Sequence, residues 1–108
     1  MLDVTPLLAA VDRFADRLRA APESRLRRGA AAEGLALARE LSVRAQRLET
    51  PDREPRVMPD AGAFAVADQV AVAGRDLAEA LRSTTTAPSA ELDEAVGLIG
   101  EAGERAFG

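Results

Sequence analysis

Apolar side chains recur every three or four positions in four separate segments of the chain, and this spacing limits the possible folds more than any other feature. It places the apolar residues of each segment on one face of an α-helix. The clearest segment runs from about Thr5 to Ala21, and its apolar stripe consists of Val4, Leu7, Leu8, Val11, Phe14, Ala15 and Leu18. No segment shows the period-two alternation of a strand. The sequence therefore predicts an all-α protein.

Three more helices follow from the same pattern. We expect the second after the break at Pro22-Glu23-Ser24 and as far as about Glu49, with an irregular first turn at Arg27-Arg28-Gly29. The third is expected over Ala61–Arg82, and the fourth begins with Ser89 as its cap.

Short polar side chains and prolines mark the other predicted helix starts. Thr5 is expected to cap the first helix, with Pro6 in the first helical position, where a missing N–H costs nothing. Asp60 is expected to cap the third helix, and Pro59 with Phe64 occupies the positions of a hydrophobic staple.

The connections predict how the helices are arranged. The break at residues 22–24 is so short that the first two helices should lie antiparallel, as an αα-hairpin. Residues 50–59 contain three of the six prolines and are expected to lack regular structure. Together with the short 83–88 linker, this pattern predicts one helical domain over residues 1–108: a four-helix up-down-up-down bundle of two αα-hairpins joined by a proline-rich loop.

The composition removes most catalytic chemistry. The chain has no His, Cys, Lys, Tyr, Trp or Asn, and its fourteen positive charges are all Arg. Proton transfer at neutral pH depends mostly on His, with Lys, Cys, Tyr and carboxylates as the other options, and no carboxylate lies at the centre of an apolar stripe. Zinc sites and the di-metal sites of helical bundles use His or Cys. We therefore expect no enzyme, no metal site and no cofactor.

The start of the chain, Met1 to Pro6, lacks the basic and apolar regions of a secretory signal. Uncharged apolar stretches such as residues 61–67 are far shorter than the ~20 residues that span a bilayer. These features predict a cytoplasmic protein that does not enter a membrane. Exclusive use of Arg with abundant Ala and Gly is typical of a bacterium with a high-GC genome.

Several side chains lie off the apolar stripes and outline a candidate protein-binding surface. Val72 points nearly opposite the stripe of its helix, and Phe64 also lies well outside it. The whole candidate surface consists of Leu35, Val43, Phe64, Val72, Gln69 and Asp76. We expect its four apolar members to pack against another chain, most simply a second copy in a homodimer. The alternative interpretations are a staple role for Phe64, one ordinary exposed valine, and a second helix with wide contacts.

Charge is divided unevenly along the chain. Residues 1–49 carry nine Arg against seven acids, and residues 50–108 carry five Arg against eleven acids. The candidate anion contacts are Arg25, Arg27 and Arg28 at the first bend and Arg53 and Arg56 in the proline-rich loop. They suggest, as an alternative, a regulatory domain that contacts nucleic acid or a nucleic-acid-binding partner through the bend. A pI of about 4.8 and the absence of Tyr and Trp argue against nucleic acid, and halves of opposite sign favour complementarity within or between chains.

Three glycines, Gly97, Gly100 and Gly103, weaken the last predicted helix, each by up to ~1 kcal/mol relative to Ala. They predict either a frayed end or close approach of another helix at a dimer seam. The Ala-rich stripes leave one more alternative, an interior that binds a small apolar molecule, although close packing is the simpler interpretation. The sequence thus predicts a non-enzymatic interaction or structural protein whose partner it does not identify.

Overall fold

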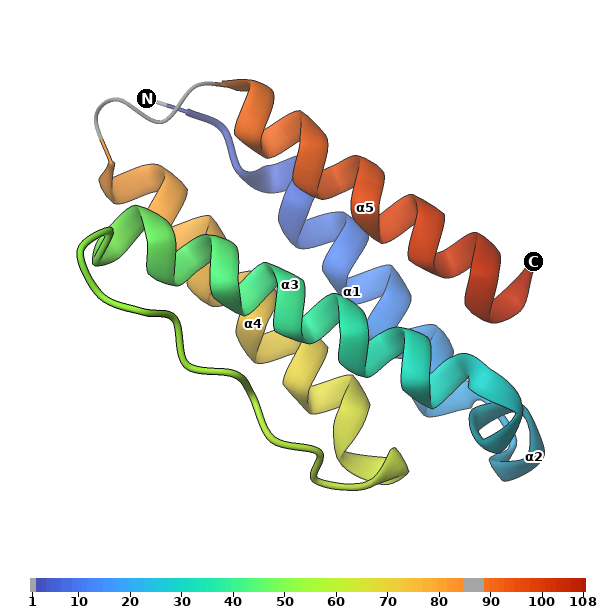
Figure 1. Ribbon diagram of the computed structural model, residues 1–108. Coiled ribbons are helices and arrows are strands. Elements are labelled where there is room, and N and C mark those ends of the chain that lie inside the picture. The colour runs from blue at the N-terminus through green and yellow to red at the C-terminus, as the bar shows by residue number, and fades with distance from the viewer. Residues whose placement is uncertain (1, 85–88) are drawn as a thin grey trace.

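The computed structural model describes residues 2–84 and 89–108, and the regular structure of that part is entirely helical (Figure 1). The predicted all-α four-helix bundle is confirmed. Short helical turns, α2, η1 and η2, precede two of the four long helices. In chain order the elements are α1 (Thr5–Ala20), α2 (Glu23–Arg25), η1 (Leu26–Ala30), α3 (Ala31–Glu49), η2 (Ala63–Ala65), α4 (Val66–Ser83) and α5 (Ser89–Phe107).

The helix directions differ from the up-down-up-down order expected from the sequence. Helices α1 and α5 run one way, and α3 and α4 run the other way (Figure 1). The starts of α3 and α4 meet, because a Cβ atom on Gly34 would lie 2.5 Å from Val66 Cγ1. The end of α3 meets the start of α5, where Arg44 pairs with Glu94. The order is therefore up-down-down-up, with α3 and α4 parallel.

The connection between α3 and α4 allows this parallel arrangement. Helix α3 is about 28 Å long at 1.5 Å per residue. The thirteen residues 50–62 can span up to about 43 Å, so they return along the full length of α3 before α4 begins. Prolines indicated an irregular loop here, but they did not indicate where the loop goes.

Around the bundle the packing order is α1, α4, α3, α5. The consecutive helices α1 and α3 are antiparallel, as predicted, but they occupy opposite corners instead of forming a tightly paired hairpin. The bend between them explains this position. Leu26–Ala30 forms a wide turn with Gly29 at φ 143°, a backbone conformation that glycine adopts readily, and the turn carries α3 across the end of the bundle. The predicted irregular turn is thus confirmed.

The first helix begins one position away from the expected cap. Thr5 is already the first helical residue, and Val4 occupies the N-cap position. The side chain of Asp3 satisfies a backbone N–H at the helix start instead, because its Oδ1 accepts a hydrogen bond of 3.0 Å from the Thr5 N–H. Hydrogen bonds from the Thr5 side chain and backbone lower the pKa of Asp3.

The start of the third predicted helix also differs. Asp60 Oδ1 accepts a 2.9 Å hydrogen bond from the Gly62 N–H and so closes a turn before η2, and α4 follows at Val66. The expected staple is not formed, because Phe64 leaves 79% of its surface exposed. Ser89 opens α5, but most of the 83–88 linker lies outside the described residues.

The connection over residues 50–62, here called the crossover loop, is held to α3 by hydrogen bonds from side chains. The amide of Gln46 bonds the backbone of Arg56 in both directions: its Nε2 donates to the carbonyl oxygen at 2.9 Å, and its Oε1 accepts from the N–H at 2.9 Å. Arg39 Nε donates to the Met58 carbonyl oxygen at 2.8 Å. These bonds satisfy backbone groups that lack partners from regular structure.

Replacing Gln46 by Ala removes both bonds to Arg56, and we expect the free energy of unfolding to fall by about 1–2 kcal/mol. Urea denaturation followed by far-ultraviolet circular dichroism measures this change. Arg47→Ala is the matched control, because the exposed Arg47 side chain is on the same helix turn, and it should change stability by less than ~0.5 kcal/mol. Equal stability of both variants would show that the amide does not hold the loop.

The core is rich in Ala, as the Ala-rich stripes indicated. Helix α4 contacts both α1 and α3, and its fully buried large side chains are Val70, Leu77 and Leu81. No polar or charged residue is buried anywhere in residues 2–84 and 89–108.

None of the described helices is long and apolar enough to cross a membrane.

Candidate protein-binding surfaces

The structure separates the apolar residues predicted to form one binding surface. Leu35 is buried in the core, with 9% of its surface exposed, and does not belong to such a surface. Leu35 is buried because the crossover loop brings Asp60, Ala63 and the start of α4 beside this side of α3. Val43 is half-buried on the same helix. Only the two predicted apolar residues of the η2–α4 segment remain on the surface.

Phe64 and Val72 are both exposed, Phe64 to 79% and Val72 to 52%. Phe64 stands at the rim of a hollow of about 210 Å³ between α1 and the start of α4. The hollow is mostly apolar and is lined by Leu18, Arg19, Ala21, Leu26, Ala63, Phe64 and Ala67. An exposed ring therefore lies beside an unfilled apolar space.

The two polar members of the predicted surface differ in availability. Gln69 is half-buried, and its Nε2 donates a 2.9 Å hydrogen bond to the Pro59 carbonyl oxygen, so this side chain anchors the crossover loop. Asp76 is exposed on the outer face of α4. Of the predicted set, Phe64, Val72 and Asp76 are accessible to a partner.

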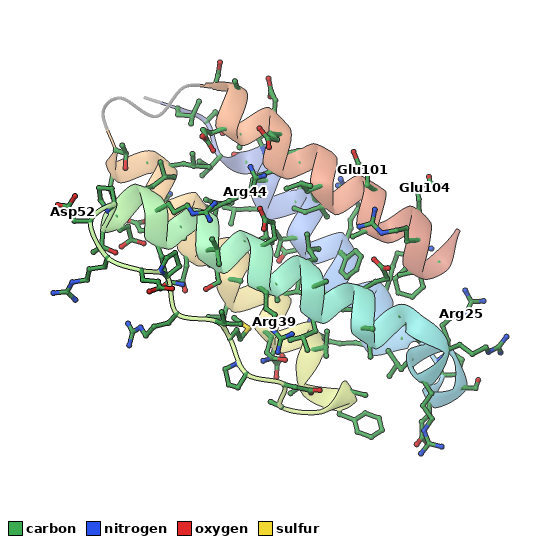
Figure 2. The ribbon with its side chains drawn as sticks, in the orientation of Figure 1. Arg25, Arg39, Arg44, Asp52, Glu101 and Glu104 are labelled. Carbon is green, nitrogen blue, oxygen red and sulfur yellow. The ribbon has the colours of Figure 1, made fainter. Side chains whose placement is uncertain are left out.

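The predicted anion contacts form two groups at opposite ends of α3. Arg25 lies at the bend, whereas the proline-rich loop with Asp52 lies at the far end of the bundle (Figure 2). Arg27 forms an i, i+4 ion pair with Glu23. The second group, Arg53 and Arg56, lines a hollow of about 470 Å³ together with Glu49 and Glu54. Its charges balance, so this hollow does not select an anion.

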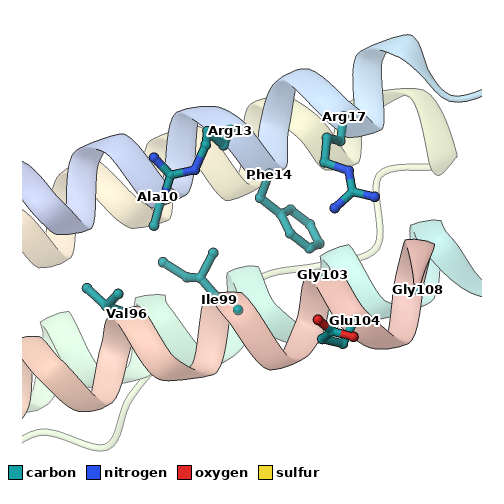
Figure 3. A pocket seen from close by; sticks show the side chains of 10 residues that line it. Ala10, Arg13, Phe14, Arg17, Val96, Ile99, Gly103, Glu104 and Gly108 are labelled. Atoms are coloured by element: carbon teal, nitrogen blue, oxygen red, sulfur yellow. The ribbon is translucent and has the colours of Figure 1, made fainter.

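A groove between α1 and α5 was not predicted from the sequence (Figure 3). Its volume is about 420 Å³, and its lining includes Ala10, Arg13, Phe14, Arg17, Val96, Ile99, Gly100, Gly103 and Glu104. The rings of Phe14 and Phe107 meet edge to face, with centroids 5.9 Å apart and an interplanar angle of 64°. The Arg17 guanidinium lies 4.3 Å from the centre of the Phe107 ring. The only feature of the sequence that pointed to this groove is the regular spacing of the glycines in α5.

Ion pairs join the two halves of opposite charge. Arg44 has 18% of its side chain exposed and bonds Glu40 at 2.9 Å on its own helix and Glu94 at 2.7 Å on α5. Burial opposes the charge of Arg44, but these two carboxylates outweigh it and raise its pKa. Arg19 of α1 bonds Asp68 of α4 at 3.0 Å.

The arginines beside the α1–α5 groove have no such partner. No carboxylate in the described part of the chain lies within 4.0 Å of Arg13, Arg17 or Arg25. Arg17 and Arg25 share a second hollow with Phe107, of about 340 Å³, next to the groove. Three arginines without an ion pair therefore lie close together at and beside the groove.

Comparisons of the chain with protein-family models, with curated proteins and with solved structures found no match.

Two surfaces combine apolar space with accessible groups that a partner can meet. One is the Phe64 face, which comprises Phe64, Val72 and the hollow beside Phe64. The other is the α1–α5 groove, where an apolar floor lies beside unpaired guanidinium groups. In the described residues, no three His, Cys, Asp or Glu side chains gather closely enough to hold a metal ion.

Proposed function

We propose that the protein is a non-enzymatic interaction module that pairs with a second copy through the Phe64 face. The observation that carries the proposal is the 79% exposure of Phe64 beside an apolar hollow of about 210 Å³. Isolated apolar residues on a surface are ordinary. Phe64 differs because the hollow exceeds the ~150 Å³ of an apolar cavity that accepts benzene. In a two-fold pair, each ring can enter the hollow of the other copy.

The charges around this face support pairing between identical copies. Both signs occur close together on the outer side of α4, where Arg75 and Asp76 are exposed and Asp68 is bonded to Arg19 of α1. A two-fold axis brings a surface against itself, so a face of mixed sign offers each charge an opposite partner. A face of one sign would repel its copy.

Replacing Phe64 by Ala should weaken self-association more than tenfold, because a buried Phe side chain contributes about 1.5–3 kcal/mol. Sedimentation equilibrium over micromolar to high micromolar concentrations measures the dissociation constant. The free energy of unfolding of the monomer should stay within ~0.5 kcal/mol of the wild type, because the ring is exposed in the single chain.

Val57→Ala is the matched control for this experiment. Val57 is 68% exposed on the crossover loop and does not line the hollow, so Val57→Ala removes an exposed apolar side chain that the proposed contact does not use. A wild-type protein that sediments as a monomer at high micromolar concentration would refute the pairing, and so would equal weakening by both variants.

The alternative function, contact with nucleic acid through the bend, has less support. Arg27 is paired with Glu23, and the second arginine group of the prediction lies about 28 Å away along α3. Nucleic-acid binding relies on many phosphate contacts, which a continuous basic face provides. The cytoplasmic location and the bacterial origin stay predictions from the sequence.

A further inference from the structure

We propose that the α1–α5 groove is a second, separate binding site, and that it takes an acidic amphipathic segment of a partner protein. The segment places an aliphatic or aromatic side chain on the floor of the groove and directs its carboxylates to Arg13, Arg17 and Arg25. This site lies between helices α1 and α5 and shares no lining residue with the Phe64 face.

The floor of the groove is apolar and open because α5 lacks side chains there. Phe14 and Ile99 are buried at its base, and Val96 is half-buried at its side. A Cβ atom placed on Gly100 would meet no other atom within 4 Å. The missing side chains therefore leave room for one or two apolar side chains of a ligand, and the volume of about 420 Å³ falls within the range of binding clefts.

The wall that α1 provides determines the charge of the occupant. Arg13 and Arg17 are one turn apart on the same side of α1, and Arg25 adds a third guanidinium beside Phe107. Contact with the Phe107 ring holds Arg17 in place, which reduces the side-chain entropy lost on binding a carboxylate. Glu104 lies on the opposite wall, so the carboxylates of the ligand must face α1. The three guanidinium groups and the Glu104 carboxylate together carry a net charge of +2, which favours an acidic ligand.

Other occupants fit less well. Phosphates of a nucleic acid would meet the guanidinium groups but would leave the apolar floor exposed to water. A second copy could offer its own acidic helix, α5. However, the exposed positions of that helix between Asp93 and Arg105 are acids, glycines and one arginine. Its large apolar side chains there, Val96 and Leu98, are half-buried against its own core, so they fit the groove of another copy less well than an exposed aliphatic or aromatic side chain.

The test begins with a library of random short peptides displayed on phage and selected on the wild-type protein. We expect the enriched peptides to combine several Asp or Glu residues with one or two aliphatic or aromatic residues. Enrichment of neutral or basic peptides, or of none, would overturn the proposal. Affinities are then measured with the enriched peptide made synthetically with a tryptophan, whose fluorescence is free of background because the protein has no Trp or Tyr.

Gly100→Leu fills the groove and should weaken peptide binding at least about tenfold. Gly97→Leu is its matched control: a Cβ at Gly97 also meets no atom within 4 Å, but Gly97 does not line the groove, so affinity should stay within about twofold. Arg17→Glu should weaken binding about tenfold or more, and higher salt should weaken wild-type binding. The urea concentration at the midpoint of unfolding should be at least as high for both leucine variants as for the wild type, because leucine favours a helix more than glycine does.

The outcomes separate this proposal from self-association. Phe64→Ala should leave peptide affinity unchanged. The proposal of peptide binding and the proposal of self-association can therefore be refuted independently. Undiminished binding to Gly100→Leu would overturn the proposal. Loss of dimer in Gly100→Leu would also overturn it, because the groove would then be occupied by a second copy.

Discussion

Replacing Leu77 by Ala is expected to lower the free energy of unfolding by about 2–5 kcal/mol. Leu77 has 1% of its surface exposed and lies on α4, the helix that packs against both α1 and α3. Most other buried positions of α4 are Ala or Gly, so few large side chains fill the centre of the bundle. A domain of this size has a total stability of about 5–15 kcal/mol. This one substitution therefore removes a large part of it.

Urea denaturation followed by far-ultraviolet circular dichroism measures the loss, since the chain has no Trp or Tyr for fluorescence. Leu77→Met conserves volume and should cost less than ~1.5 kcal/mol. Val72→Ala, on the exposed side of the same helix, should stay within ~0.5 kcal/mol of the wild type. A loss below ~1 kcal/mol for Leu77→Ala would mean that the neighbouring helices close over the space, and that the core is not close-packed.

The helices themselves were predictable because their apolar stripes are regular. The first was expected from about Thr5 to Ala21 and spans Thr5–Ala20, and the second ends at Glu49 as expected. Gly29 marked the bend correctly, since only a residue without a side chain adopts φ 143° at little cost. Local patterns therefore give the elements and their irregularities.

The arrangement of the helices depends on distances that local patterns do not contain. A proline-rich loop can join antiparallel neighbours or cross the whole bundle, and only its anchoring decides between them. Here Gln46, Arg39 and Gln69 bind the backbone of the loop along α3, and α4 starts beside the start of α3. Each of these bonds joins groups ten or more positions apart, and nothing in the spacing of the residues indicated them.

The candidate sites changed for the same reason. Leu35 was expected at the surface because it lies off its helix stripe, but the crossover loop and the start of α4 cover that side of α3. The α1–α5 groove was missed because its walls come from the first and last helices, and no pattern within one segment places Gly103 beside Phe14. Phe64 is exposed, as its position off the apolar stripe predicted, and the alternative hydrophobic staple is not formed.

The second large effect is a contrast between two glycines that receive the same substitution. A Cβ atom on Gly74 would lie 2.5 Å and 2.7 Å from the two Cγ atoms of Val11, whereas a Cβ on Gly100 meets nothing within 4 Å. Gly→Ala gains up to ~1 kcal/mol of helix stability at either position. At Gly74 the overpacked contact costs about 1–3 kcal/mol, because the β-branched Val11 is stiff and cannot turn away.

We therefore expect Gly100→Ala to stabilise the protein by up to ~1 kcal/mol and Gly74→Ala to be less stable than Gly100→Ala by about 1–3 kcal/mol. The helix-propensity gain is common to both variants, so their difference in unfolding free energy isolates the steric cost of the α1–α4 contact. Equal stability of the two variants in urea would show that α1 and α4 can separate freely at this point.

Combining Gly74→Ala with Val11→Ala tests whether Val11 is the cause. Val11→Ala alone removes two buried methyl groups and should destabilise the protein, since Val11 has 1% of its surface exposed. In the double variant the clashing Cγ atoms are absent, and the new Cβ occupies part of the space that they leave. The double variant should therefore be more stable than the sum of the two single effects, with a coupling of about 0.5–3 kcal/mol. Additive effects would place the strain elsewhere and would remove the reason for a glycine at the α1–α4 crossing.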